Sequence, residues 1–154
     1  MSDQNSIRVR LEVHGRVQGV GFRPTVYRLA AALRLGGVVG NDAQGAFIEI
    51  EGPPAAVEDF VRRLPLELPA RAEIAGLDRS SIPAVGASEF RIDLSRAAGE
   101  QEAEISPDIA TCADCLREMR DPADRRYRYP FINCTNCGPR YSIVQGVPYD
   151  RART

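Results

Sequence analysis

Hydrophobic and charged residues alternate along residues 7–13, near the start of the chain. Four aliphatic side chains fall on one face of this segment and three charged side chains on the other, which predicts a half-buried strand. A glycine-rich turn follows at residues 15–21. Apolar positions then recur at helical spacing through residues 22–35, and Gly36 and Gly37 end the predicted helix.

The pattern next predicts a β-hairpin and a second helix. A strand begins at Val38, residues 41–45 form a turn, and residues 46–51 return as the partner strand. Pro53 and Pro54 open the second helix, because proline is tolerated in a first helical turn. One face of this helix is apolar and consists of Val57, Phe60, Val61 and Leu64.

Two further short strands are expected at residues 70–77 and 90–94. The resulting order, β-α-β-β-α-β, is that of a ferredoxin-like α+β fold in which two helices cover one face of a sheet. Residues 1–94 are therefore expected to form one domain. An acidic linker with few apolar residues, 95–106, then leads to a small module, 107–154, which holds all four cysteines.

The composition narrows the classes of protein that fit. Of the 154 residues, 44% are hydrophobic, which is enough for a buried core, and the formal net charge is only −1. A balanced charge gives no general attraction to nucleic acid or to an anionic membrane. Residues 1–10 lack the apolar segment of a signal peptide, and no apolar run reaches the roughly 18 residues that span a bilayer. We expect a soluble, cytoplasmic protein that does not bind membranes.

The glycine-rich turn is the first candidate site. Three glycines within residues 15–21 allow left-handed backbone conformations, so that consecutive N–H groups can converge on one anion at a helix N-terminus. Arg23 can offer a bidentate guanidinium to the same anion. Glycine spacing alone also fits a tight turn beside a surface arginine. The residues whose backbone is expected to bind phosphate are Arg16, Val17, Gln18, Gly19, Val20 and Gly21.

Two Cys-x-x-Cys pairs form the second candidate site. Cys112 and Cys115 are separated from Cys134 and Cys137 by 18 residues, a spacing typical of a tetrahedral zinc site with four thiolate ligands. One structural zinc ion per chain is expected, and so small a module should need it to fold. A redox dithiol pair or two disulfides are the alternatives. The locally basic residues 120–129 could contact RNA, although a solvated surface is their ordinary explanation.

The string VQGVGFR, between a predicted strand and a predicted helix, resembles the signature of the acylphosphatases over roughly residues 7–94. The resemblance implies hydrolysis of carboxyl phosphates without a metal or a covalent intermediate. The amides of residues 16–21 and Arg23 would hold the phosphoryl oxygens, and the side-chain amide of Asn41 would orient the attacking water. Asn41 could otherwise serve only as a turn residue. His14 is expected to make local contacts at a strand end, not to act in catalysis.

The two halves together resemble a larger family. The strings GRVQGVGFRPTVYRLA, DIATCADCLREMRDPADRRYRYPFINCTNCGPRYSI and PYDR are similar to those of the hydrogenase-maturation carbamoyltransferases HypF. This resemblance implies that carbamoyl phosphate is split at the first domain and that ATP activates the carbamate as carbamoyl-adenylate. The carbamoyl group would then pass to the C-terminal cysteine of a hydrogenase-maturation partner protein.

The HypF family normally continues past the position of Thr154 with a second zinc module and with adenylating and transferase domains. We therefore expect this chain to be a fragment, with ATP binding confined to the missing C-terminal part. Two rival hypotheses stay open. One is a general acylphosphatase with a fused zinc module, and the other is a zinc ribbon for nucleic acid beside an inactive first domain. The sequence pI of about 5.9 weighs against the zinc ribbon.

Overall fold

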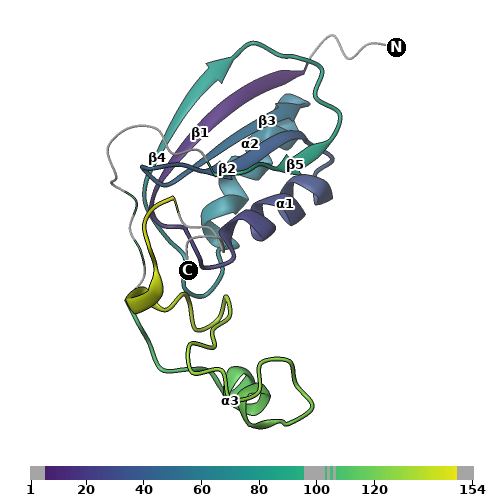
Figure 1. Cartoon of the computed structure of the whole chain (residues 1–154). Coiled ribbons are helices and arrows are strands. Elements are labelled where there is room, and N and C mark those ends of the chain that lie inside the picture. Colours follow the sequence, from purple (N-terminus) through teal and green to yellow (C-terminus); the bar gives the residue numbers. More distant parts are fainter. Residues whose placement is uncertain (1–5, 96–102, 104, 106, 149–154) are drawn as a thin grey trace.

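The computed structural model describes residues 6–95, 103, 105 and 107–148 (Figure 1). The first range folds into a sheet with two helices, and the last range forms a smaller unit beyond one end of that sheet. In chain order the elements are β1 (Ile7–Arg16), α1 (Phe22–Ala32), β2 (Gly36–Asn41), β3 (Ala46–Gly52), α2 (Pro54–Arg63), the 3-10 helix η1 (Leu64–Leu66), β4 (Glu73–Ile82), β5 (Phe90–Ile92), α3 (Ala113–Arg120) and the 3-10 helix η2 (Tyr141–Ile143).

The five strands lie in the order β4-β1-β3-β2-β5. β1 is antiparallel to both β3 and β4, and β2 is antiparallel to β3, so the predicted hairpin is confirmed. The first four strands with α1 and α2 have the predicted β-α-β-β-α-β order, which confirms the ferredoxin-like α+β fold. β5 extends this sheet, because it pairs in parallel with the outer edge of β2.

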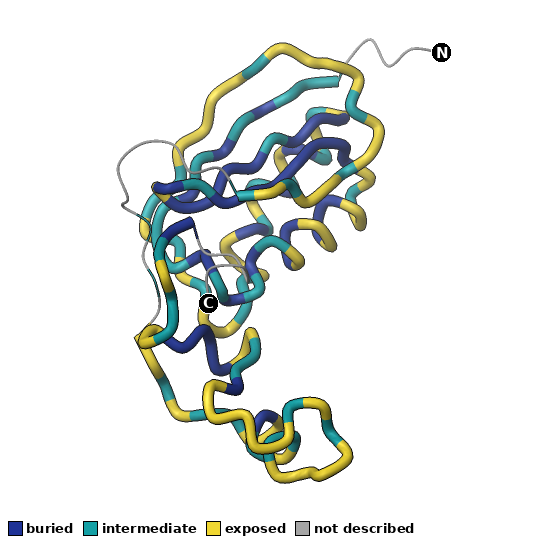
Figure 2. The backbone as a smooth tube through the Cα atoms, viewed as in Figure 1, coloured by how far each residue is buried: buried dark blue, intermediate teal, exposed yellow. Residues whose placement is uncertain are grey.

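One face of the sheet is buried beneath α1 and α2 (Figure 2). Along β1, Val9, Leu11 and Val13 are buried, whereas the residues between them are partly exposed, as predicted for a half-buried strand. Removing these apolar side chains from water is the main drive for packing the helices on the sheet. The same core includes Val26, Leu29 and Ala30 of α1, Val39 of β2, Ile48 and Ile50 of β3, and Val57 and Phe60 of α2.

The other face of the sheet carries charged side chains. Arg10 of β1 lies opposite Glu49 of β3, and its Nη1 atom is 2.9 Å from Oε1 of that glutamate. Glu51, two residues further along β3, is only 4% exposed. Its carboxylate accepts hydrogen bonds from the backbone N–H groups of Val85, at 3.0 Å, and Gly86, at 2.8 Å. Glu51 therefore fixes the irregular segment between β4 and β5 against the sheet.

Two predicted boundaries near the first candidate site are wrong. β1 continues to Arg16, beyond the predicted end at residue 13, because it pairs with β4 over this length with a register shift between His14 and Gly15. α1 ends at Ala32, before the predicted end at residue 35. Arg34 has a φ of 54°, a left-handed conformation that cannot continue a right-handed helix.

The later strands also differ from the prediction. β4 begins and ends later than the expected residues 70–77, and β5 is shorter than the expected residues 90–94. β4 lies at the sheet edge with most of its side chains exposed, so it lacks the alternation by which a strand is recognised in sequence.

The cysteine-containing unit includes a helix, α3, that the sequence did not predict. Of its side chains only that of Cys115 is buried, which explains why apolar periodicity is weak there. Most of the predicted linker, 95–106, lies outside the described residues, as do residues 1–5 and 149–154. Among the described helices, none combines the length and the apolar character needed to cross a membrane.

Candidate functional site

The predicted anion-binding loop joins β1 to the N-terminus of α1 (Figure 1). Gly19 and Gly21 have φ angles of 74° and 81°, in the left-handed region that glycine adopts without steric cost. The side chains of Val17 and Val20 are 1% and 0% exposed and belong to the main core. These two buried side chains therefore fix the conformation of the loop. Gly21, its last residue, is the N-cap of α1.

Gln18 connects this loop to the turn that follows β2. Its side chain is 1% exposed, and its Nε2 atom donates to the carbonyl oxygens of Asp42, at 2.8 Å, and Gly45, at 2.7 Å. Asn41, which is also 1% exposed, is the last residue of β2 and immediately precedes this turn. The structure thus brings the predicted loop and the segment of Asn41 together, and the side-chain role of Gln18 was not foreseen from sequence.

Arg23 is the second residue of α1 and is half-buried, at the helix end where the peptide dipoles give a partial positive charge. The side chain of Arg16 is engaged elsewhere, because its Nη2 atom lies 3.2 Å from a carboxylate oxygen of Glu73 on β4. Any contact of Arg16 with an anion in the loop is therefore assigned to its backbone. His14 lies beside the neighbouring strand β4, with Nε2 3.4 Å from Oδ2 of Asp78.

The four cysteines converge into one cluster whose Sγ atoms all lie within 4.8 Å of one another. The Sγ–Sγ distance is 3.6 Å between Cys112 and Cys134, and 3.9 Å from Cys137 to both Cys134 and Cys115. A tetrahedral zinc ion with Zn–S bonds of about 2.3 Å requires sulfur atoms about 3.8 Å apart. The cluster therefore fits zinc, whereas a disulfide would need sulfur atoms about 2.05 Å apart.

The side chain of Arg140 is buried within the cysteine-containing unit, next to the cluster. The residue is 7% exposed, and its guanidinium donates to the carbonyl oxygen of Ile132 from Nε, at 3.0 Å, and from Nη2, at 2.8 Å. Nη2 also lies 2.9 Å from Oγ1 of Thr111 and 3.4 Å from Sγ of Cys137. A zinc ion with four thiolates carries a net charge of −2, so a buried guanidinium beside one sulfur partly offsets that charge.

Arg126 also approaches the cluster. Its Nη1 atom donates to the carbonyl oxygen of Asn133 at 2.7 Å, and its Nη2 atom is 3.9 Å from Sγ of Cys115. Its Nε atom lies 2.8 Å from a carboxylate oxygen of Glu118. Arg126 belongs to the basic stretch 120–129, so the expectation that this stretch is only a solvated surface is wrong for this residue. Neither arginine was recognised from sequence as a partner of the cysteines.

The thiols of the cluster differ in acidity. Burial raises the pKa of Cys115, and hydrogen bonds with Cys112, Cys134 and Cys137 raise it further. Burial also opposes ionisation of Cys137, but backbone and side-chain hydrogen bonds within the cluster outweigh it and lower its pKa to about 6. Binding of a divalent cation by the four sulfur atoms would displace the protons that the thiols carry.

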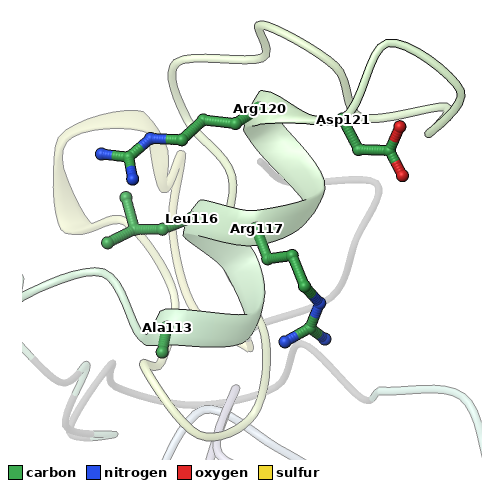
Figure 3. A pocket seen from close by; sticks show the side chains of 5 residues that line it. All are labelled: Ala113, Leu116, Arg117, Arg120 and Asp121. Carbon is green, nitrogen blue, oxygen red and sulfur yellow. The ribbon is translucent and has the colours of Figure 1, made fainter.

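A shallow groove lies on the outer face of α3 (Figure 3). The side chains that line it point in different directions from one short helix, and Arg117 is paired with Asp114 at 2.7 Å. The groove gathers no set of converging polar groups, so no binding function is assigned to it. Its lining residues are Ala113, Leu116, Arg117, Arg120 and Asp121.

Comparison with known proteins agrees with this geometry. The carbamoyltransferase HypF of Synechocystis sp. is 49% identical over 146 residues, which are 95% of this chain and 19% of that protein. A crystal structure of full-length HypF in the phosphate- and nucleotide-bound form superimposes with a TM-score of 0.85 and 43% identity. The superposition covers 97% of this chain and 20% of that one. The chain thus spans about a fifth of the length of these relatives.

Shorter relatives match the first domain alone. The acylphosphatase of Moorella thermoacetica is 42% identical over 91 residues, which are 58% of this chain and 96% of that protein. The family model named Acylphosphatase matches residues 9–92, and the model named HypF finger matches residues 111–144. The chain therefore belongs to the acylphosphatase family and corresponds, with its cysteine unit, to the acylphosphatase and finger region of the HypF carbamoyltransferases.

Proposed function

We propose that residues 16–21, Arg23 and Asn41 form a site that hydrolyses carbamoyl phosphate to carbamate and phosphate. The observation that carries this proposal is the pair of hydrogen bonds from Gln18 to the turn after Asn41, at 2.8 Å and 2.7 Å. These bonds hold the loop, which is suited to binding an oxyanion, beside the end of β2, where Asn41 carries a side-chain carboxamide. Preorganisation of this kind is what hydrolysis of an activated phosphate needs.

The chemistry follows from the groups available. Backbone N–H groups of the loop and the guanidinium of Arg23 would bind the phosphoryl oxygens and stabilise the charge that they carry in the transition state. The side-chain amide of Asn41 would orient a water molecule for attack on phosphorus. The bond from phosphorus to the acyl oxygen then breaks, carbamate leaves with the electron pair, and the attacking water releases its proton. A carbamate anion is a weakly basic leaving group, so no general acid is required.

Relatives support the choice of substrate. HypF has been crystallised with phosphate and nucleotide bound, and the shorter relatives are named acylphosphatases. In the whole protein, the carbamate would be activated with ATP as carbamoyl-adenylate. The carbamoyl group would pass to a cysteine of a partner protein, in segments outside this chain. We assign residues 1–94 to hydrolysis, residues 95–106 to a linker and residues 107–154 to a module held by one structural zinc ion, all in a cytoplasmic protein.

Phosphate release from carbamoyl phosphate tests the proposal. Replacing Arg23 or Asn41 by alanine is expected to lower kcat/KM by about 100-fold or more, because each removes a group that stabilises the transition state. Arg28→Ala is the matched control, because Arg28 is an exposed arginine of the same helix. It should keep activity within about twofold of the unchanged protein. Circular dichroism should show all three variants folded.

The result that overturns the proposal is equally specific. Turnover of carbamoyl phosphate by folded Arg23→Ala at the rate of the unchanged protein would remove the arginine from the site. Binding of RNA or DNA that weakens steeply with salt, without hydrolysis of any acyl phosphate, would instead favour a nucleic-acid module.

A further inference from the structure

The turn between the second pair of cysteines lies next to the loop of the first domain. A Cβ atom built on Gly21 would lie 3.3 Å from Cβ and 3.4 Å from Cγ2 of Thr135, the residue that directly follows Cys134. Gly21 is the last residue of the loop and the N-cap of α1. The turn between Cys134 and Cys137 therefore reaches the end of the loop at which Arg23 enters the helix.

A second contact fixes this turn to the first domain. The Nε atom of Arg71 donates to the carbonyl oxygen of Asn136 at 3.3 Å, from the segment that precedes β4. Within the turn, the N–H of Gly138 donates to the carbonyl oxygen of Cys134 at 2.8 Å. Thr135 is exposed in spite of its contact with Gly21. Its side chain thus has one side against the loop and another open to a molecule that approaches the loop.

A free-standing relative matches only part of this chain. The acylphosphatase of Moorella thermoacetica aligns over 96% of its own length with only 58% of this chain, so the rest of the chain has no counterpart in it. In this chain, a threonine of the turn between two clustered cysteines lies next to Gly21.

We propose that Thr135 is a specificity-determining residue of the acyl phosphate site. It limits the space beside the loop, so that a compact acyl group such as carbamoyl or acetyl is accepted and an aryl group is disfavoured. The inference rests on the function proposed above, because it assumes that the loop binds the phosphoryl group. Thr135 lies between two clustered cysteines, in a turn that two hydrogen bonds fix, so its backbone is held in place as steric selection requires.

The test compares kcat/KM for carbamoyl phosphate and for benzoyl phosphate in the full chain with zinc bound. Thr135→Ala is expected to raise the ratio of benzoyl to carbamoyl turnover by about 10-fold, and Thr135→Phe to lower it. The ratio is the informative quantity, because partial unfolding lowers both rates together and leaves the ratio unchanged. Asn136→Ala is the control, since its contact with Arg71 uses the backbone carbonyl oxygen.

The outcomes separate the two proposals. If the unchanged protein hydrolyses both substrates and Thr135→Ala leaves the ratio the same, Thr135 has no part in selection although the hydrolytic site stands. If neither substrate is hydrolysed, or if hydrolysis does not depend on Arg23, the site itself is wrong and this inference is overturned with it. A shifted ratio in Thr135→Ala with an unshifted one in Asn136→Ala supports the inference.

Discussion

The Nε2 atom of Gln18 lies 2.8 Å from the carbonyl oxygen of Asp42, and this hydrogen bond links the loop before α1 to the turn after β2. The two segments are far apart in the chain and belong to different strand ends. Gln18 therefore joins the loop whose backbone is expected to bind phosphate to the turn that directly follows Asn41. A buried amide that determines the geometry of a site should affect activity more than its own stabilising energy suggests.

Replacing Gln18 by leucine is the direct test of this linkage. The carbonyl oxygens of Asp42, which is partly buried, and of Gly45, which is buried, lose the amide as donor, which should lower the free energy of unfolding by about 1–3 kcal/mol. The kcat for carbamoyl phosphate should fall by about 10-fold or more, because Asn41 is no longer held against the loop. Urea unfolding and phosphate release measure the two effects.

Gln44→Leu is the matched control for this substitution, because Gln44 is an exposed glutamine of the same turn. It should change the free energy of unfolding by no more than about 0.5 kcal/mol and the kcat by no more than about twofold. Activity of Gln18→Leu as high as that of Gln44→Leu would show that the site tolerates the absence of the Gln18 amide.

Gly21→Ala should lower the thermal stability of the protein for two reasons that can be measured separately. The φ of 81° is strained for alanine, at about 1–2 kcal/mol, and the new Cβ would meet Thr135 at 3.3 Å. Gly86→Ala shares the first cost but not the second, because Gly86 has a φ of 73° and a Cβ added there would meet nothing within 4 Å. Thermal unfolding should therefore show a greater loss for Gly21→Ala than for Gly86→Ala.

The contact between the two units can then be isolated with a double substitution. Thr135→Gly in the Gly21→Ala background removes both the Cβ and the Cγ2 atom that the new methyl group would meet, so it should recover the excess loss and make the two changes less than additive. Additive effects would mean that Thr135 and Gly21 are not in contact in solution.

Glu51 should make stability depend on acid pH. Burial alone would raise its pKa, but backbone N–H groups of residues 85–87 and the guanidinium of Arg8 outweigh it and leave the pKa below its usual value of 4.5. A lowered folded-state pKa stabilises the fold at pH values above about 4.5, and the contribution is lost as pH falls through the folded pKa. Glu51→Gln should cost about 1–3 kcal/mol at pH 7.

The same comparison at lower pH checks the sign. The difference in unfolding free energy between Glu51→Gln and the unchanged protein should shrink as pH falls below about 4.5. Glu89→Gln, at an exposed position of the same segment, is the control and should change the unfolding free energy at pH 7 by no more than about 0.5 kcal/mol. A difference for Glu51→Gln that grows in acid would contradict the assigned role of the carboxylate.

Local signals in the sequence were enough for much of the fold, for the loop after β1 and for the cysteine cluster. Alternation predicted β1, the glycines predicted the loop at its end, and the cysteine spacing predicted a cluster that the structure assembles. Each of these features depends on residues close together in the chain, whose geometry follows from periodicity, turn chemistry or ligand spacing.

The features that the sequence did not predict depend on contacts between distant residues. In the sequence, the side chain of Gln18 is not distinguished from that of any other polar loop residue, because its partners lie in the turn after β2. Thr135 is likewise not distinguished from any other residue between two cysteines, because its neighbour Gly21 is distant in the chain. Arg140 likewise reads as a surface charge. Burial of such a group is decided by the packing of several segments, for which a single sequence carries no local pattern.

Arg140 offers the sharpest test of how the cysteine unit is held together. Arg140→Met keeps the apolar part of the side chain but removes donors to the carbonyl oxygen of Ile132, to Thr111 and to the sulfur of Cys137. Zinc affinity, measured by competition with a chromophoric chelator, should fall by about 10- to 100-fold, as for other groups that support metal ligands.

Arg117→Met is the control in the same unit, because the side chain of Arg117 is 68% exposed and pairs only at the surface with Asp114. Such a pair contributes about 0–1 kcal/mol, so zinc affinity should hardly change. If Arg140→Met binds zinc as tightly as Arg117→Met does, the four thiolates hold the ion without help from the buried guanidinium. Arg140 would then act only in packing the chain around them.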